Sequence, residues 1–202
     1  MEKLKKCPIT TSLIVTSFVV YLFTFILYGE TMSAYEGLEM GAFNPVVVLY
    51  YKEYYRLVFA NFLHFGVFHV AINCYSLYNV GTILERLVGI KNMIWVVVVS
   101  TFSTSLVPLA SYLLFGSGAN TVLAGISGIV CGLVGALFVL CYEYKDRFGD
   151  FYRSLSTNIG IMILLSITIS SVSLSGHLGG LLGGSITMYC ILQIKKKKRI
   201  LH

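Results

Sequence analysis

A serine and two histidines lie in stretches of this chain that hold no charged residue. Ser127 occurs in a Gly-x-Ser-Gly run over residues 125–128, and His69 and His177 lie in two other uncharged stretches. A serine becomes a useful nucleophile when a neighbouring base removes its proton, and histidine is the usual base near neutral pH. These residue types indicate acyl-transfer chemistry, with either histidine able to serve as the base.

Donors for an oxyanion also occur near one of these histidines. Asn73 follows His69 by one helical turn, so the two side chains share a helix face. Together with the backbone N–H of Ser127, they suit the oxyanion of a tetrahedral intermediate. No Asp or Glu lies in the outer half of an expected span, which favours a Ser-His dyad over a triad with a carboxylate.

The composition indicates the environment in which these groups act. The chain has 202 residues, 56% hydrophobic and 12% charged, whereas a soluble domain carries about twice that charged fraction. We therefore expect a single integral membrane domain. The net charge of +6 does not indicate nucleic-acid binding, because the basic residues flank apolar runs and do not alternate with aromatic residues. The five scattered cysteines form no disulfide framework or CxxC metal site, and no cofactor is expected.

Four charge-free runs reach the length of about 20 residues that a membrane-spanning helix needs. They cover residues 7–29, 57–84, 92–142 and 154–194. The last two are of double length, with breaks at Gly116–Asn120 and at the serine cluster of 170–175. The sequence thus predicts an all-α, compact bundle of six transmembrane helices. The expected spans are about 8–28, 65–84, 93–115, 123–142, 155–172 and 175–194.

The distribution of basic residues predicts the orientation. With six spans, thirteen of the fifteen Lys and Arg residues share one side with both termini, and only Lys52 and Arg56 lie on the other. The positive-inside rule then places both termini in the cytoplasm. Residues 29–56 become one long external loop, whose tyrosines suit the membrane interface. The absence of a transit peptide before the first span favours a bacterial plasma membrane.

The same topology puts the polar groups at one depth. Spans two, four and six run inward from the outer face, starting near residues 65, 123 and 175. His69, Ser127 and His177 then lie four, four and two residues into their helices, in one outer-leaflet layer.

Glycines on spans four and six favour one histidine as the base. Both spans carry small-xxx-small faces, which let helix backbones approach closely. Gly128 adjoins Ser127, and Gly180 lies one turn below His177, so close packing would bring Ser127 beside His177. His177 is therefore the better candidate than His69.

Three motifs resemble those of the rhomboid family of intramembrane serine proteases, over essentially the whole chain. Their residues are Arg56, His64, His69, Asn73, Gly81 and Glu85 around span two, Gly-x-Ser-Gly at 125–128, and His-x-x-Gly-x-x-x-Gly at 177–184, which includes Gly180 and Gly184. The resemblance implies a serine endopeptidase that cleaves single-pass transmembrane substrates within the lipid bilayer. It also implies Ser127 as nucleophile, His177 as general base, and His69 with Asn73 as oxyanion-hole donors.

The resemblance assigns scaffold roles as well. It implies that Arg56 and His64 brace the external loop and that Glu85 caps a hydrogen-bond network near the cytoplasmic face. Two departures from the family pattern stand out. Position 131 is Cys, where many bacterial members carry an aromatic residue that stacks on the catalytic histidine. The polar-acidic residue often found shortly before that histidine is replaced by the serine-rich segment 170–175.

The sequence argues against three other interpretations. A catalytically inactive relative that binds transmembrane segments would be expected to lack Ser127 or His177, and both are present. A small membrane transporter favours polar sites at the midplane of the membrane and inverted repeats, and the sequence shows neither. His64 and His69 are five apart, with no Glu after the first, so a zinc site of the His-Glu-x-x-His type is not expected.

Overall fold

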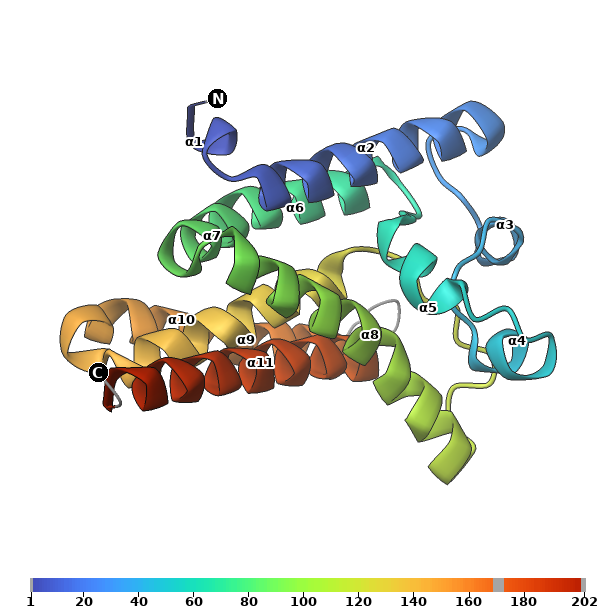
Figure 1. The fold of residues 1–202 in the computed structure, drawn as a ribbon. Coiled ribbons are helices and arrows are strands. Elements are labelled where there is room, and N and C mark those ends of the chain that lie inside the picture. The colour runs from blue at the N-terminus through green and yellow to red at the C-terminus, as the bar shows by residue number, and fades with distance from the viewer. Residues whose placement is uncertain (1, 169–172, 201–202) are drawn as a thin grey trace.

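A computed structural model describes residues 2–168 and 173–200 of the chain, and in this part every regular element is helical (Figure 1). The elements in chain order are α1 (Glu2–Lys5), α2 (Pro8–Tyr28), α3 (Ala34–Glu39), α4 (Pro45–Tyr50), α5 (Arg56–Phe59), η1 (Ala60–Phe62), α6 (Val67–Ser76), η2 (Leu77–Gly81), α7 (Thr82–Val88), α8 (Ile90–Phe115), α9 (Ser127–Glu143), α10 (Lys145–Thr168) and α11 (Leu174–Ile200). This confirms the predicted all-helical class.

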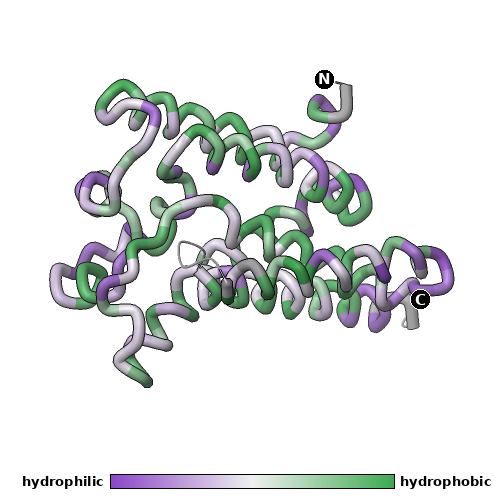
Figure 2. Tube along the Cα trace, turned by 180° about the vertical axis from the view of Figure 1, so that it is seen from behind, coloured by the Kyte–Doolittle hydropathy of each residue, from purple (hydrophilic) through white to green (hydrophobic). Residues whose placement is uncertain are grey.

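Four of the described helical segments are long and apolar enough to cross a membrane. They are Pro8–Tyr28, Val67–Val88, Ile90–Phe115 and Leu174–Lys197, and the apolar helix Ser127–Glu143 is shorter. Hydrophobic residues cover most of the helices, while hydrophilic residues gather toward the two ends of the bundle (Figure 2). Large apolar side chains such as Ile26 and Phe68, each 79% exposed, point outward from this bundle. Such a surface fits a lipid environment, so the chain is a helical membrane protein.

The connection between α8 and α9 is longer than expected. Gly116 ends α8 in the left-handed conformation, and α9 begins only at Ser127 instead of near residue 123. The intervening chain makes a turn at 117–120, after which Leu123 is bridged to Phe43 of the segment expected as the external loop. This pairing satisfies backbone groups that a helix would otherwise bond internally. In the second expected break, Ser170 and Ser171 lie outside the described residues, and Ser173 lies directly before α11.

A carboxylate ties α2 to the segment expected as span two. That segment is α6, a π-helical turn η2, and α7 in succession. Glu85 of α7 accepts hydrogen bonds from the backbone N–H groups of Ile9 and Thr10 and from the Thr10 hydroxyl, at 2.7–2.9 Å. These N–H groups belong to the first turn of α2 and lack helical acceptors. Gly81 lies against Thr10, with no room for a side chain between them.

The segment 29–56, which was predicted to be an external loop, is folded and contains α3 and α4. It lies at the end of the bundle opposite to where α2 begins and α11 ends (Figure 1). Arg56, which is 6% exposed, holds it together from inside. Its guanidinium donates to the carbonyls of Leu38 and Ala42 at 2.7 and 2.8 Å and pairs with Glu53. A buried charge is stable only when it is paired in this way.

The closest helix packing in the bundle involves α11, which lies against both α8 and α9. On the α9 side, Gly180 meets the carbonyl of Gly128, and one turn further Gly184 meets the carbonyl of Gly132. A Cβ atom at Gly180 or Gly184 would overlap these carbonyls. Small residues at the crossing thus let the two backbones touch, as small-xxx-small faces allow.

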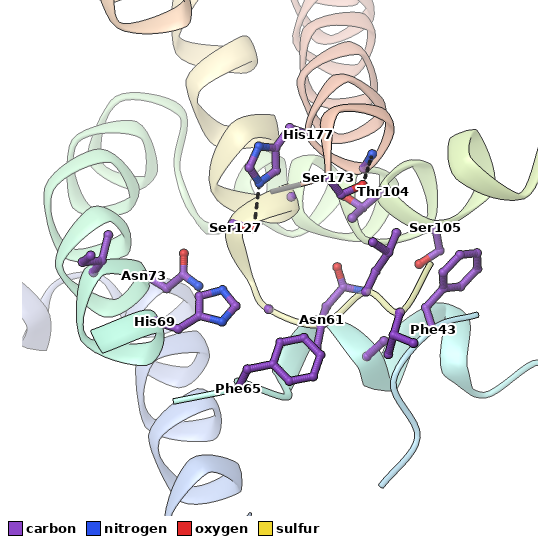
Figure 3. A pocket seen from close by; sticks show the side chains of 18 residues that line it. Phe43, Asn61, Phe65, His69, Asn73, Thr104, Ser105, Ser127, Ser173 and His177 are labelled. Atoms are coloured by element: carbon purple, nitrogen blue, oxygen red, sulfur yellow. Dashed lines mark hydrogen bonds between the residues drawn. The ribbon is translucent and has the colours of Figure 1, made fainter. Parts of the chain in front are cut away.

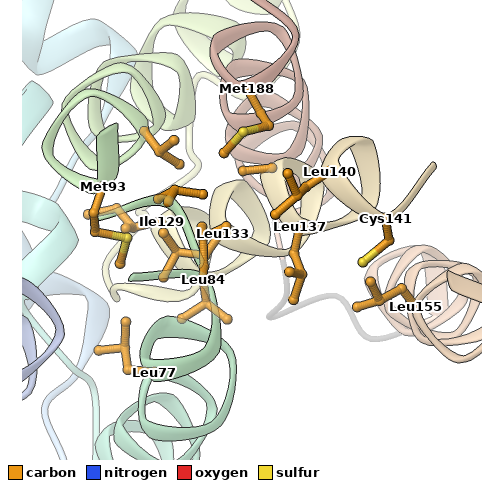
Figure 4. Packing of buried hydrophobic residues seen from close by; sticks show 14 of the residues in the cluster. Leu77, Leu84, Met93, Ile129, Leu133, Leu137, Leu140, Cys141, Leu155 and Met188 are labelled. Atoms are coloured by element: carbon orange, nitrogen blue, oxygen red, sulfur yellow. The ribbon is translucent and has the colours of Figure 1, made fainter. Parts of the chain in front are cut away.

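The hydrophobic core surrounds α9 (Figure 4). Leu133 and Leu137 of α9 are fully buried between Leu84 of α7, Met93 of α8 and Met188 of α11. Side chains from three other helices therefore fix α9 in the centre of the molecule.

The packing of α9 on α11 makes a testable prediction. Gly180→Ala should lower stability by about 1–3 kcal/mol, because its methyl group would force the backbones apart. Gly160→Ala on α10 is the matched control, since a Cβ there meets nothing within 4 Å. The measurement is thermal unfolding of the purified protein in detergent. Equal unfolding temperatures for Gly180→Ala and the unaltered protein would show that the crossing is looser than described.

Candidate active site

Ser127 and His177 face each other across the helix pair α9 and α11. The Nε2 atom of His177 lies 2.9 Å from the Oγ atom of Ser127, and both side chains are partly buried (Figure 3). Their positions along the helices differ from the expected ones: Ser127 is the first residue of α9, and His177 is the fourth of α11. The hydrogen bond joins residues 50 positions apart in the chain.

The position of Ser127 at a helix start has a chemical consequence. The first N–H groups of a helix have no acceptor inside it, and the helix dipole makes this end favourable for negative charge. The Ser127 backbone N–H is one of these groups. A developing oxyanion beside Ser127 would therefore meet a free backbone donor.

Gly125 allows the loop before Ser127 to pass close to α6. Its φ angle is +117°, in the region that favours glycine. A Cβ atom there would lie 2.7 Å from Nε2 of His69 and 3.5 Å from Nδ2 of Asn73. The loop backbone thus lies directly against both side chains. The Gly125 N–H donates to the Ala60 carbonyl at 3.0 Å.

His69 and Asn73 bring donors from α6 to the same place. Asn73 is 5% exposed, and its Nδ2 atom has no hydrogen-bond partner among the described residues. An unpaired buried amide costs free energy unless a ligand or water completes it. The ring of His69 is stacked on Phe65 with centroids 6.4 Å apart, and His64 lies edge-on to it at 5.0 Å.

These groups share one cavity of about 430 Å³. Its walls also include the extended segment 122–125 and side chains from the external loop and α8, some of which Figure 3 labels. The other lining residues are Phe43, Ala60, Asn61, Phe65, Ile72, Thr104, Ser105, Gly128, Ser173 and Gly176. The cavity combines apolar walls with a few convergent polar groups, as ligand sites generally do.

His64 holds the loop that precedes Ser127. Its Nδ1 donates to the Phe62 carbonyl at 3.0 Å, and its Nε2 accepts from the Ile126 N–H at 3.5 Å. Both partners lie outside residues 29–56, and the role of His64 in bracing that segment stays a prediction. His64 is fully buried before the start of α6, and burial together with the neighbouring His69 lowers its pKa to about 3.

The remaining residues from the sequence motifs lie apart from the reacting pair. Arg56 contacts the external loop, and Gly81 and Glu85 contact α2. Gly128 lines the cavity, whereas Gly180 and Gly184 set the approach of α11 to α9.

Two contacts of the site were missed by the sequence reasoning. Ser166 of α10 lies 2.9 Å from Nδ1 of His177, and Cys131 of α9 contacts the Met162 sulfur at 3.1 Å. Ser166 stands in an apolar run as one of many serines, so only the packing of α10 beside α11 distinguishes it. Within the described part of the chain, no group of three His, Cys, Asp or Glu residues is placed to hold a metal ion.

The fold and site together define a helical membrane protein with a serine-histidine pair in a cavity. Comparison with known proteins identifies the family: residues 51–194 match the Rhomboid domain, and the chain belongs to the rhomboid family. This confirms the family that the sequence motifs indicated.

Individual relatives agree. Rhomboid protease GluP of Bacillus subtilis is 32% identical over 65% of this chain, and YdcA of the same bacterium is 23% identical over 95% of it. RHOMBOID-like protein 1 of Arabidopsis thaliana is 32% identical over 76% of the chain. The aligned part of the chain spans 25% of the length of GluP, 39% of the Arabidopsis protein and 92% of YdcA.

The pKa of His64 predicts how stability depends on pH. The folded protein keeps His64 neutral down to about pH 3, whereas the unfolded chain binds a proton near pH 6.5. Stability contributed by neutral His64 is therefore complete above pH 6.5 and falls as the pH drops toward 3. Thermal unfolding at pH 7 and pH 4.5 should show a smaller loss for His64→Gln than for the unaltered protein. An equal loss in both would assign the pH dependence to other groups.

Proposed function

We propose that this protein is an intramembrane serine endopeptidase that uses Ser127 and His177 as a catalytic dyad. The observation that carries the proposal is the 2.9 Å contact between the Ser127 hydroxyl and His177 Nε2 inside a cavity. This is the hydrogen-bond distance that a general base needs. Membership of the rhomboid family, together with a relative named as a rhomboid protease, supports the same activity.

The reaction proceeds in two steps. His177 Nε2 takes the Ser127 proton while Oγ bonds to the substrate carbonyl carbon, and the same proton then passes to the leaving amine as the C–N bond breaks. Water then attacks the acyl carbon and gives a proton to His177, and this proton passes to Ser127 Oγ as the bond between Oγ and the acyl carbon breaks. Ser127 is regained, and no cofactor takes part.

The oxyanion of each tetrahedral intermediate is held by donors that surround the loop at Gly125. His69, Asn73 and the Ser127 backbone N–H supply them, and the unpaired Nδ2 of Asn73 is the strongest support for this role. Donors fixed in advance stabilise the transition state more than the substrate, because they need no rearrangement as charge develops.

The substrate in this proposal is a single-pass transmembrane helix. Its backbone is bonded internally, so its outer end must unwind before a peptide carbonyl reaches Ser127. The family resemblance implies substrates with small side chains at the scissile bond and helix-breaking residues just below it. We place the protein as a six-span protein of a bacterial plasma membrane, with both termini cytoplasmic and the site near the outer face.

Loss of either dyad member should abolish cleavage. Ser127→Ala and His177→Ala are each expected to lower kcat by about 10⁴-fold or more, since Ser and His act as one unit. Cleavage of a model type I transmembrane substrate by purified protein in liposomes measures this. Ser111→Ala on α8 is the matched control and should retain full activity. The Ser111 hydroxyl forms a hydrogen bond with the Ser117 hydroxyl, away from the cavity.

The outcomes separate the candidate functions. Cleavage that survives both dyad substitutions would overturn the assignment of Ser127. Absence of cleavage by the unaltered protein across several substrates, with binding retained, would instead identify a protein that binds transmembrane segments without cutting them.

Removal of the Asn73 donor should slow catalysis without preventing substrate binding. Asn73→Ala is expected to lower kcat about 10²–10³-fold with little change in KM, the usual cost of losing one oxyanion donor. Steady-state kinetics on the same substrate measures both constants, with Asn158→Ala on the exposed face of α10 as the control. A large rise in KM with unchanged kcat would show that Asn73 binds substrate in its ground state.

A further inference from the structure

We infer that Ser166 on α10 is a positioning residue, which holds His177 in the tautomer and orientation that the dyad requires. The inference rests on the proposed function and deepens it. Its basis is a continuous run of hydrogen bonds from Ser127 through His177 and Ser166 to the backbone of α10. The Ser166 side chain is 6% exposed, so solvent has little access to the contact.

The hydrogen bond from Ser166 to the backbone of α10 fixes the direction of the other two. The Ser166 hydroxyl donates to the Met162 carbonyl at 2.8 Å, because a carbonyl can only accept. Its lone pairs then face His177 Nδ1 at 2.9 Å, and this nitrogen must carry the proton. Neutral imidazole has a single N–H, so Nε2 is left to accept the Ser127 proton. The chain of bonds thus selects the tautomer that can act as a base.

A carboxylate performs this task in the Ser-His-Asp triad, where its main effect is to hold the imidazole in the correct tautomer and orientation. Within the described residues, no Asp or Glu contacts His177. A hydroxyl supplies the same acceptor geometry without a buried charge, which is costly at membrane depth. It stabilises the imidazolium less than a carboxylate would, so its contribution is expected to be smaller.

A second contact, between α9 and α10, holds Ser166 in place. Met162, whose carbonyl accepts the Ser166 hydroxyl, receives the Cys131 thiol on its sulfur at 3.1 Å. Cys131 is buried on α9, one turn after Ser127. It occupies the position at which many bacterial members of the family carry an aromatic residue that stacks on the catalytic histidine. In this chain, the ring of His177 is therefore supported through α10 and its hydroxyl.

The test compares two substitutions of nearly equal shape. Ser166→Thr keeps a hydroxyl that can bond the carbonyl four residues back, whereas Ser166→Val replaces it with a methyl group. We expect Ser166→Val to lower kcat about tenfold with KM unchanged, the size of effect that one ordinary hydrogen bond supports. Ser166→Thr should restore most of that loss. The rate of Ser127 labelling by a fluorophosphonate should follow kcat, because labelling needs the same base.

Ser156 offers the matched control on the same helix. Its hydroxyl also bonds the carbonyl four residues back, that of Tyr152, but it is exposed and touches no histidine. Ser156→Val should leave kcat and labelling unchanged. If Ser166→Val and Ser166→Thr agree within twofold in kcat, the inference is overturned.

The tautomer itself can be read without any substrate. The chain has four histidines, so ¹⁵N imidazole shifts can be assigned with a His177→Ala variant. We expect the Nδ1–H form of His177 in the unaltered protein and a mixture of tautomers in Ser166→Val. An Nε2–H form in the unaltered protein would overturn the inference. This readout stands even if no substrate is cleaved, a result that would count against the proposed protease activity alone.

Discussion

The close approach of α9 and α11 at Gly128 and Gly180 is the contact on which the site depends. Backbone touches backbone there, so the first turn of α9 and that of α11 are held at the distance of a hydrogen bond between Ser127 and His177. Larger residues would separate the helices by more than that bond can stretch. The same glycines give little apolar side-chain burial, and the core leucines of α9 supply it further along the helix.

Several buried polar side chains are tied to partners from other segments, and this requirement shapes the rest of the molecule. Glu85 accepts hydrogen bonds from backbone N–H groups at the start of α2, and Arg56 donates hydrogen bonds to carbonyls of segment 29–56. His64 holds Ile126 next to the nucleophile. Asn73, in contrast, keeps a donor open beside the cavity. A site that must bind a transient negative charge needs such an unpaired donor, at a cost to stability.

The support of His177 illustrates how one position can compensate for another. Cys131 is too small to stack on the imidazole, and instead it contacts Met162 on α10. Met162 in turn accepts the hydroxyl that faces His177. The orientation of the base therefore depends on how α10 packs against α9, a contact between helices, in addition to the fold of α11 itself.

Local properties of the chain were enough to determine its class. Hydropathy and charge are read from neighbouring residues, so the sequence alone determined an all-helical membrane protein, and its motifs determined the family. The motifs also singled out Ser127 and His177 as candidates. Tertiary structure decided what depends on segments brought together from far apart: the late start of α9, caused by pairing of residue 123 with Phe43, the partners of His64, and the contact of Ser166 with His177. The periodicity of the sequence does not predict these contacts, because they depend on how helices far apart in the chain pack together.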